Sequence, residues 1–243
     1  MYYKLYHFKS LTSTQDKAKE FSKKGLSNAI IVSDIQTKGR GRFKRKWHSD
    51  KGGLWMSILL KPNDIKNLQY LTFAAAISVV KVIKKIAKLK TSIKWPNDVH
   101  CNGKKLCGIL TEGIFGKENY VVVGIGLNAN QNKFPDEIKE IATSLKIIKK
   151  KDINIKKLRE EIIDEFFFLC NNYYNKNKLN LILKAWRQYC DTINKNVVVI
   201  TRSKKLRGKA VGVDRDCNLL LKLKSGKTSE NQRFSGHRKS VKC

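Results

Sequence analysis

The sequence predicts an α/β (α+β) fold that ends in a small all-β module. Short apolar segments typical of strands alternate with segments of helical periodicity up to about residue 191. Residues 71–89 carry apolar side chains at helical spacing and lysines on the other side, which indicates a helix packed on a sheet. After Asn196, short strand-like segments separated by turns take over. We therefore place a boundary at 192–196 and expect two units, 1–193 and 194–243.

The first unit is expected to begin with a helix at 12–24, because Thr12 or Ser13 can cap its start and Gly25 can end it. Further helices are expected at 71–89, 156–174 and 178–191. Strands are expected at 29–32, 54–60, 92–95, 99–101, 106–111 and 120–125, and in the second unit at 197–201, 208–213 and 219–223.

The composition favours a globular protein with a packed core over a disordered or membrane-spanning one. Hydrophobic residues make up 41% of the 243 residues, which is enough for a packed core. The sequence has no run of about 18 apolar residues, and residues 1–7 lack the apolar segment of a signal peptide, so we expect a cytoplasmic protein without a membrane span. The six cysteines form no CxxC pair, and none lies near a histidine at metal-ligand spacing, which predicts reduced thiols.

The formal net charge of +31 allows two interpretations. It can mark a surface that meets polyanions such as nucleic acid, or it can reflect lysine drift on exposed faces. The lysines are spread along the whole chain and do not form one basic arm, which favours drift.

The most informative segment is the loop expected at 37–53, which is dominated by glycine, arginine and lysine. Its glycines allow the backbone to approach a ligand closely, its arginines offer planar donors for phosphate or carboxylate, and its tryptophan can stack on a base. These residues are Gly39, Arg40, Gly41, Arg42, Arg45 and Trp47. Such a loop can order around an anion, and its composition alone fits an RNA-binding patch equally well.

A turn and a hairpin bring further charged side chains together. In the turn 94–98, with the sequence KWPND, Asp98 can bind a magnesium ion that also holds nucleotide phosphates. The dipeptide Asn102-Gly103 predicts a two-residue hairpin turn that pairs Cys101 with Lys104, His100 with Lys105, and Asp98 with Cys107.

On that register, Asp98, His100, Lys105 and Cys107 share one face of the hairpin. Asp98 and Lys105 become diagonal neighbours, about 7–8 Å apart at the backbone. A carboxylate and an ammonium aimed at one space suit phosphoryl or acyl-adenylate chemistry. The alternative is a surface ion pair worth under about 1 kcal/mol.

The strand expected at 120–125 runs out through Gly124 and Gly126 to Asn128, which could read an adenine edge. Two glycines at this spacing are a weak nucleotide signal, because no helix clearly follows.

The order of these motifs along the chain resembles the biotin protein ligase family over about residues 8–130. The series runs from Ser13-Thr14-Gln15 through Gln36, the segments 39–47, 94–98 and 105–110, to 124–128. The resemblance implies a mixed sheet backed by helices and identifies the C-terminal module with an SH3-like β-barrel. It implies an enzyme that makes biotinyl-5′-AMP from biotin and Mg-ATP, releases pyrophosphate, and transfers biotin to a lysine of a biotin carboxyl carrier domain.

The resemblance also implies the roles of individual residues. Ser13, Thr14 and Gln36 would hydrogen-bond the ureido ring of biotin, with Gln15 beside them. Residues Gly39 to Arg42 and Arg45 would close over biotin and its adenylate, and Trp47 would lie against the adenine. Lys105 would contact the biotin carboxylate and the α-phosphate, Asp98 would hold magnesium, and Asn128 would contact the adenine. The same site would include Lys94, Asn97, Gly108 and Ile109, and the expected catalytic residues are Lys105, Arg42, Arg40 and Asp98.

The sequence departs from the family pattern at Gln15, where asparagine is usual, and at Lys44, where glycine is common. About a dozen residues precede Ser13, so the winged-helix domain of bifunctional members, and with it sequence-specific DNA binding, is not expected. A homodimer is one option, since many relatives pair through the sheet. The rivals are a nucleic-acid-binding module, which predicts steeply salt-dependent binding, and a lipoate ligase, whose glycine-rich motif is not found here.

Overall fold

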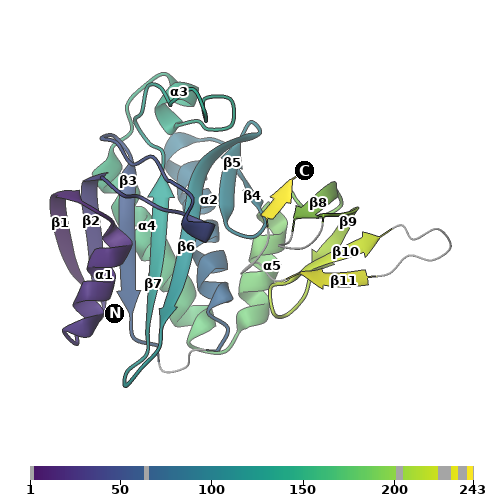
Figure 1. Ribbon diagram of the computed structural model, residues 1–243, viewed down its shortest axis with the longest axis horizontal. Coiled ribbons are helices and arrows are strands. Elements are labelled where there is room, and N and C mark those ends of the chain that lie inside the picture. Colours follow the sequence, from purple (N-terminus) through teal and green to yellow (C-terminus); the bar gives the residue numbers. More distant parts are fainter. Residues whose placement is uncertain (1–2, 63–65, 201–204, 224–230, 235–239, 243) are drawn as a thin grey trace.

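The computed structural model describes residues 3–62, 66–200, 205–223, 231–234 and 240–242. A seven-stranded sheet with the order β1-β2-β3-β7-β6-β5-β4 forms its centre (Figure 1). The strands are β1 (Lys4–Leu11), β2 (Ala29–Gln36), β3 (Leu54–Leu60), β4 (Ser92–Lys94), β5 (Asp98–Cys101), β6 (Lys104–Ile114) and β7 (Tyr120–Leu127). β1 and β2 are parallel and the other ladders are antiparallel, so the expected mixed sheet is confirmed.

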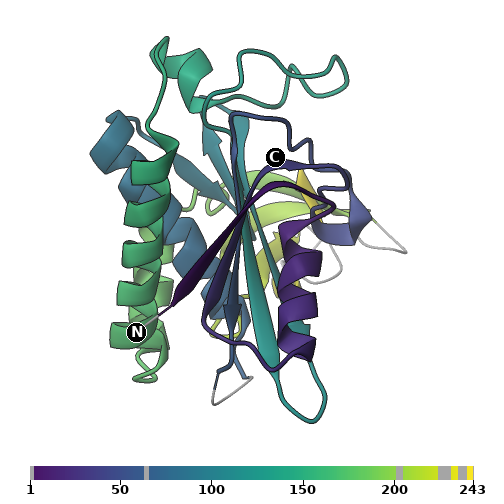
Figure 2. The same cartoon turned by 90° about the vertical axis from the view of Figure 1, so that its left-hand side faces the viewer.

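Helices cover both faces of this sheet (Figure 2). α1 (Thr14–Lys23) packs on one face, where Ala18 and Phe21 share a small core with Ile31 and Leu59. The other face carries α2 (Gln69–Ala87), α4 (Ile155–Leu169) and α5 (Leu179–Tyr189) over the larger core. A short helix, α3 (Leu145–Lys149), precedes α4, and a π-helical turn, Cys170–Tyr174, follows it.

The start and end of α1 follow from local chemistry. The Ser13 hydroxyl accepts a hydrogen bond from the Gln15 backbone N–H at 3.2 Å, which satisfies one of the free donors at the helix start. After the last turn, Gly25 adopts a φ of 73°, a left-handed conformation that glycine reaches without steric cost. The predicted cap and stop are therefore confirmed.

The C-terminal module is a five-stranded antiparallel sheet with the order β11-β10-β9-β8-β12. Its strands are β8 (Asn196–Ile200), β9 (Lys205–Val213), β10 (Leu219–Leu223), β11 (Asn231–Phe234) and β12 (Ser240–Lys242). Its buried side chains, Val199, Ala210 and Leu221 among them, belong to the same core cluster as those under α2. The fold class is confirmed, and the division at 193/194 stays a prediction because the two sheets share one core.

Two helices or strands of the first unit were not predicted, namely the edge strand β1 and the short α3, and neither were the last two strands of the C-terminal module, β11 and β12. The predicted end of a strand at Thr201 lies outside the described residues. Within the described part of the chain, no helix combines the length and apolar character needed to cross a membrane.

Candidate functional site

The start of α1, the end of β2 and the middle of β3 build the neutral, polar end of a cavity. The Thr14 backbone N–H donates to Oε1 of Gln36 at 2.8 Å. The Ser57 hydroxyl lies 2.8 Å from Thr14 Oγ1 and 2.9 Å from Gln15 Oε1. These side chains are buried except for Gln36, so their hydrogen bonds hold them in place. Donors and acceptors without net charge suit a neutral polar ring.

Residues 37–53, which we call the flap, fold over this cavity. Antiparallel bridges join Gln36 to Ser49 at its base and Arg40 to Lys46 nearer its tip, where residues Arg42–Lys44 form a 3-10 turn. Gly39 is required at a close approach, because a Cβ there would lie 2.3 Å from Ser49 Oγ. The predicted long loop is therefore folded in the structure, and its pairing with the end of β2 fixes where it crosses the cavity.

Trp47 rests in a slot made by two glycines on neighbouring strands. A Cβ at Gly126 would lie 2.6 Å from the indole Nε1, and a Cβ at Gly108 would lie 3.2 Å from Cζ3. The Lys105 ammonium lies 5.1 Å from the indole centroid, within cation–π range. Glycine at both positions therefore lets the tryptophan of the flap lie against the sheet beside Lys105.

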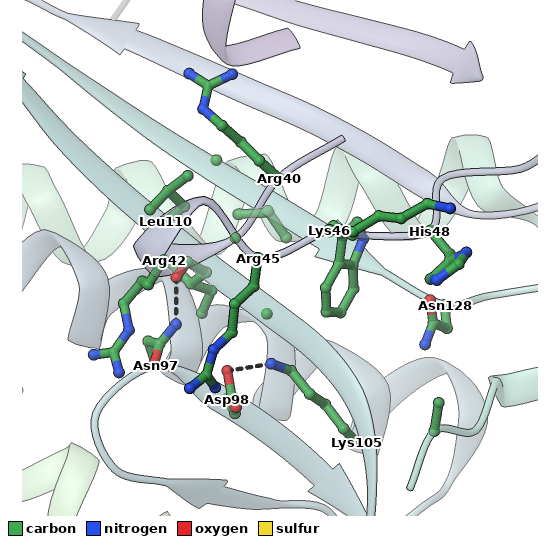
Figure 3. Close-up of a pocket in the computed structure, with 18 of the residues that line it drawn as sticks. Arg40, Arg42, Arg45, Lys46, His48, Asn97, Asp98, Lys105, Leu110 and Asn128 are labelled. Carbon is green, nitrogen blue, oxygen red and sulfur yellow. Dashed lines mark hydrogen bonds and ion pairs between the residues drawn. The ribbon is translucent and has the colours of Figure 1, made fainter. Parts of the chain in front are cut away.

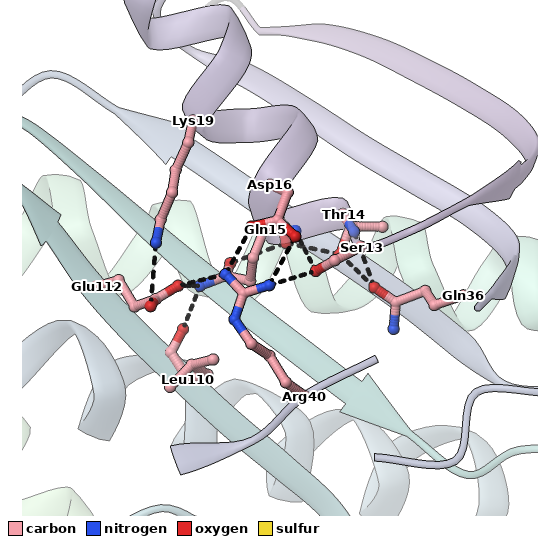
Figure 4. A network of polar contacts seen from close by, with 10 residues as sticks. Ser13, Thr14, Gln15, Asp16, Lys19, Gln36, Arg40, Leu110 and Glu112 are labelled. Atoms are coloured by element: carbon pink, nitrogen blue, oxygen red, sulfur yellow. Dashed lines mark hydrogen bonds and ion pairs between the residues drawn. The ribbon is translucent and has the colours of Figure 1, made fainter. Parts of the chain in front are cut away.

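Arg40 is directed away from the charged end of the cavity (Figure 3). Its guanidinium lies 2.8 Å from Asp16 Oδ1 and 3.4 Å from Glu112 Oε2, and it donates to Ser13 Oγ at 3.2 Å (Figure 4). Arg40 lines the cavity, and in this structure its charged group holds the flap to α1.

The other end of the cavity is charged. Lys105 Nζ lies 2.8 Å from Asp98 Oδ1, and Arg45 extends toward the same carboxylate (Figure 3). Burial lowers the pKa of Arg42, while the nearby Asp98 carboxylate raises it and Arg45 lowers it further. Guanidinium groups stay charged even when their pKa falls, so this end presents fixed positive charge around one carboxylate. Such an arrangement binds phosphate and carboxylate oxygens.

The predicted register of the hairpin is wrong beyond its first two pairs. The structure pairs Asp98 with Gly108 and Val99 with Cys107, because a bulge on β6 adds Leu106 as an extra residue. Every side chain of β6 after the bulge therefore lies on the face opposite to the one that the regular ladder predicts. Cys107 is consequently fully buried in the core, and Gly108 faces the cavity instead. Asp98 and Lys105 remain neighbours, and their side chains form an ion pair at 2.8 Å.

The side-chain amides of two predicted site asparagines donate hydrogen bonds to backbone carbonyl groups. Asn97 Nδ2 donates to the Ile109 carbonyl at 2.7 Å, and the Ile109 N–H returns a bond to the Asn97 carbonyl, which fixes the turn 94–98 against β6. Asn128 Nδ2 donates to the carbonyl of Thr143 at 3.0 Å. Their side-chain amides thus set the shape of the cavity wall.

The carboxylates allow a specific kind of magnesium site. Clusters of three or more side chains able to hold a metal ion by themselves are not found among the described residues. Among the described residues that line the cavity, Asp98 is the only one with an acidic side chain. Magnesium commonly binds through one or two carboxylates together with phosphates, so Asp98 fits an ion that arrives with a nucleotide.

All predicted site residues except Gly39 line one cavity of about 570 Å³. The cavity also contains side chains that were not predicted, including Lys46, His48, His100 and Phe134. Burial lowers the pKa of His100, whose Nδ1 lies 3.3 Å from the Gly103 carbonyl. The alternation on β5 already placed His100 on the face of Asp98. His48 and Phe134 sit in loops without such a periodic signal.

Comparison with known proteins agrees with this geometry. Residues 6–128 match the Biotin/lipoate A/B protein ligase family, and residues 192–236 match the Biotin protein ligase C terminal domain. The chain is 39% identical over 223 residues to the Bifunctional ligase/repressor BirA of Bacillus subtilis, which covers 89% of this chain and 68% of that protein. It is 31% identical over 177 residues to Biotin--protein ligase 2 of Arabidopsis thaliana, covering 68% of this chain and 51% of that protein.

Among solved structures, the biotin protein ligase from Aquifex aeolicus in complex with biotin and ATP superposes with a TM-score of 0.87 at 31% identity, covering 99% of both chains. The chain therefore belongs to the biotin/lipoate A/B protein ligase family. Within that family it groups with the biotin protein ligases, because its second match is to their C-terminal domain and the relatives named above are of that kind.

Proposed function

We propose that this cavity joins biotin to AMP at the expense of ATP and then passes biotin to a lysine of a biotin carboxyl carrier domain. The observation that carries the proposal is the division of one cavity into two chemically different ends. The neutral end, around Thr14 and Gln36, offers hydrogen bonds for the uncharged ureido ring. The charged end, around Arg42 and Lys105, offers cations for the carboxylate and the phosphates.

In the first step, an oxygen of the biotin carboxylate attacks the α-phosphorus, and the bond from that phosphorus to the bridging oxygen of the β-phosphate breaks. Pyrophosphate leaves, and a mixed anhydride remains. Two anions must approach each other, so Lys105 and Arg42 act by neutralising and orienting them. In the second step, the lysine amine of the carrier attacks the acyl carbon and AMP leaves. The flap covers the anhydride and keeps water from it.

Magnesium belongs to this proposal as the companion of ATP. Asp98 would hold it together with the phosphates, and the ion would offset phosphate charge. The ion pair between Asp98 and Lys105 implies that the carboxylate changes partner when nucleotide binds.

A cytoplasmic location remains part of the proposal. It is supported by the free thiols of Cys101, Cys107, Cys170, Cys190 and Cys217. Cys243 lies outside the described residues. Dimer formation and the expected lack of sequence-specific DNA binding stay predictions.

The decisive experiment is biotin-dependent exchange of labelled pyrophosphate into ATP, with lipoate and octanoate as alternative acids. We expect exchange with biotin alone, and at least about a hundredfold loss in Lys105→Ala, the size of effect seen when a group that stabilises developing charge is removed. Lys104→Ala is the matched control, because Lys104 Nζ lies 3.1 Å from the Lys139 carbonyl, away from Asp98. Exchange at the unmodified rate in Lys105→Ala, or equal exchange with lipoate, would contradict the proposal.

A further inference from the structure

Glu112 lies just beyond the cavity wall, on the same face of β6 as the wall itself. Side chains of a strand alternate between faces, so Gly108, Leu110 and Glu112 point to one side. Gly108 and Leu110 line the cavity. The Glu112 side chain is 28% exposed and is surrounded by polar partners from two other segments.

These partners come from α1 and from the flap (Figure 4). The Gln15 amide donates to Glu112 Oε2 at 2.8 Å, and the Arg40 guanidinium lies 3.4 Å from the same oxygen. Lys19 Nζ lies 3.1 Å from Oε1, on the solvent side. One carboxylate therefore contacts both the neutral end of the cavity and the segment that covers it.

The carboxylate decides which way the Gln15 amide faces. An ionised carboxylate only accepts hydrogen bonds, so Gln15 must turn its NH2 group to Glu112. The same NH2 group lies 3.3 Å from the Leu110 carbonyl. Gln15 Oε1 is thereby directed to the other side, 2.9 Å from the Ser57 hydroxyl, and into the space above Gly124. A Cβ at Gly124 would lie 2.8 Å from that oxygen, so the glycine makes the room for it.

We infer that Glu112 is a positioning residue that orients the Gln15 amide at the neutral end of the cavity and ties that orientation to the flap through Arg40. This inference rests on the proposed function, because it assigns the neutral end to the biotin ring. Without Glu112, the Gln15 NH2 group keeps only the longer bond to the Leu110 carbonyl. The amide can then rotate by half a turn, because the Ser57 hydroxyl can accept from an NH2 group as well as donate to an oxygen. Arg40 keeps Asp16 and Ser13, so its guanidinium loses one of the three partners that hold the flap to α1 and β6.

Asp16 makes these two effects separable. Asp16 Oδ1 lies 2.8 Å from the Arg40 guanidinium, and this ion pair connects Asp16 to the flap. Asp16→Asn therefore weakens the flap anchor and leaves the Gln15 amide in place. Lys19→Ala removes the solvent-side partner of Glu112 and serves as the matched control.

The test is steady-state kinetics of adenylate formation with biotin and ATP varied in turn. We expect Glu112→Ala to raise KM for biotin about tenfold, with kcat and KM for ATP changed less than twofold. Glu112→Gln should recover most of this loss, because its amide oxygen still accepts from Gln15. Asp16→Asn and Lys19→Ala should leave KM for biotin within about twofold.

A double mutant supplies the readout that a merely structural residue would not give. If Glu112 acts through Gln15, then Gln15→Ala with Glu112→Ala should be no worse in KM for biotin than Gln15→Ala alone. Additive losses, or an unchanged KM for biotin in Glu112→Ala, would overturn the inference. If Glu112→Ala fails to fold by circular dichroism, a tenfold KM increase in Glu112→Gln equal to that of Gln15→Ala would overturn it as well. Absence of biotin-dependent exchange in the unmodified chain would reject the proposed function itself.

Discussion

The indole N–H of Trp95 donates to the backbone carbonyl of Cys217 at 3.1 Å. Trp95 lies in the turn 94–98 that carries Asp98, and Cys217 lies in the turn between β9 and β10 of the C-terminal module. A second bond, from the Trp95 backbone N–H to Thr192 Oγ1 at 2.9 Å, joins the same turn to the segment before β8. The C-terminal module therefore holds the part of the cavity wall that binds phosphate in our proposal.

Replacing Trp95 with phenylalanine should weaken the nucleotide end of the site selectively. The change removes one hydrogen bond and leaves the Cys217 carbonyl unpaired, which should lower the free energy of unfolding by about 1–3 kcal/mol. Because Asp98 is three residues away, KM for ATP should rise while KM for biotin stays constant. Kinetics with each substrate varied in turn, together with urea unfolding, measures both effects.

Tyr70→Phe is the matched control for that variant. The Tyr70 hydroxyl donates to the Arg215 carbonyl at 2.6 Å, so its loss also breaks a bond to the C-terminal module without touching the turn 94–98. Equal increases of KM for ATP in the two variants would show that general loosening, and not the turn, is responsible.

Tyr70 also predicts a pH dependence. Burial raises the pKa of Tyr70 to about 12 from its ordinary value of 10.0, with the nearby Cys217 and Asp216 adding to the shift. The protonated phenol is the form that the fold favours, so its contribution is fully present below pH 10 and is lost as the pH rises toward 12. The unmodified chain should be more stable than Tyr70→Phe at pH 8, and the difference should shrink between pH 10 and pH 12. A difference in unfolding free energy that is constant over that range would rule this out.

Gly126→Ala should displace Trp47. The new methyl group would lie 2.6 Å from the indole Nε1, a distance that forces the ring out of its slot. We expect a loss of adenylate formation of tenfold or more with the fold retained, because the flap can shift while the sheet cannot. Gly116→Ala is the control, since nothing lies within 4 Å of a Cβ there. Intrinsic fluorescence that is unchanged in Gly126→Ala would contradict a displaced tryptophan.

Lys44→Gly should make the flap more rigid. Phe43 and Lys44 have φ values of 59° and 58°, a left-handed conformation that costs a residue with a side chain about 1–2 kcal/mol. Glycine removes that cost at Lys44 and loses a smaller amount, about 0.5–1 kcal/mol, to the greater freedom of the open flap. Amide hydrogen exchange across 38–47 should therefore slow in Lys44→Gly. It should not slow in Lys46→Gly, which lacks a left-handed backbone to relieve.

Sequence patterns predicted the elements that depend on local chemistry. The start of α1 at Ser13, its end at Gly25 and the burial of β3 follow from capping, glycine conformation and apolar composition. The residues of the candidate site could also be predicted from the sequence, because they come from motifs whose order along the chain is specific. The edge strand β1 was not predicted, because its exposed and half-buried side chains form neither a regular alternation nor a continuous apolar run.

Tertiary contacts decided what the patterns did not. The bulge at Leu106 depends on how β6 meets β5 and β7, and the hairpin rule assumes a regular ladder. Two successive apolar residues, Leu106 and Cys107, interrupt the alternation and are the trace that this bulge leaves in the sequence. The direction of the Arg40 side chain, toward Asp16 and Glu112, depends on helix α1 and strand β6 together. Residues next to Arg40 in the chain do not predict it.

The extra residue at Leu106 also limits how this enzyme can change over evolutionary time. In an uninterrupted strand, the thiol of Cys107 would stand where the indole of Trp47 now rests, and glycine would fall in the core, leaving a hole there. Deleting Leu106 itself would keep the pairs Val99–Cys107 and Asp98–Gly108 but would remove a fully buried side chain from the core. Insertions and deletions should accordingly be tolerated at the tip of the β6–β7 hairpin and excluded from the short stretch between Lys105 and Gly108.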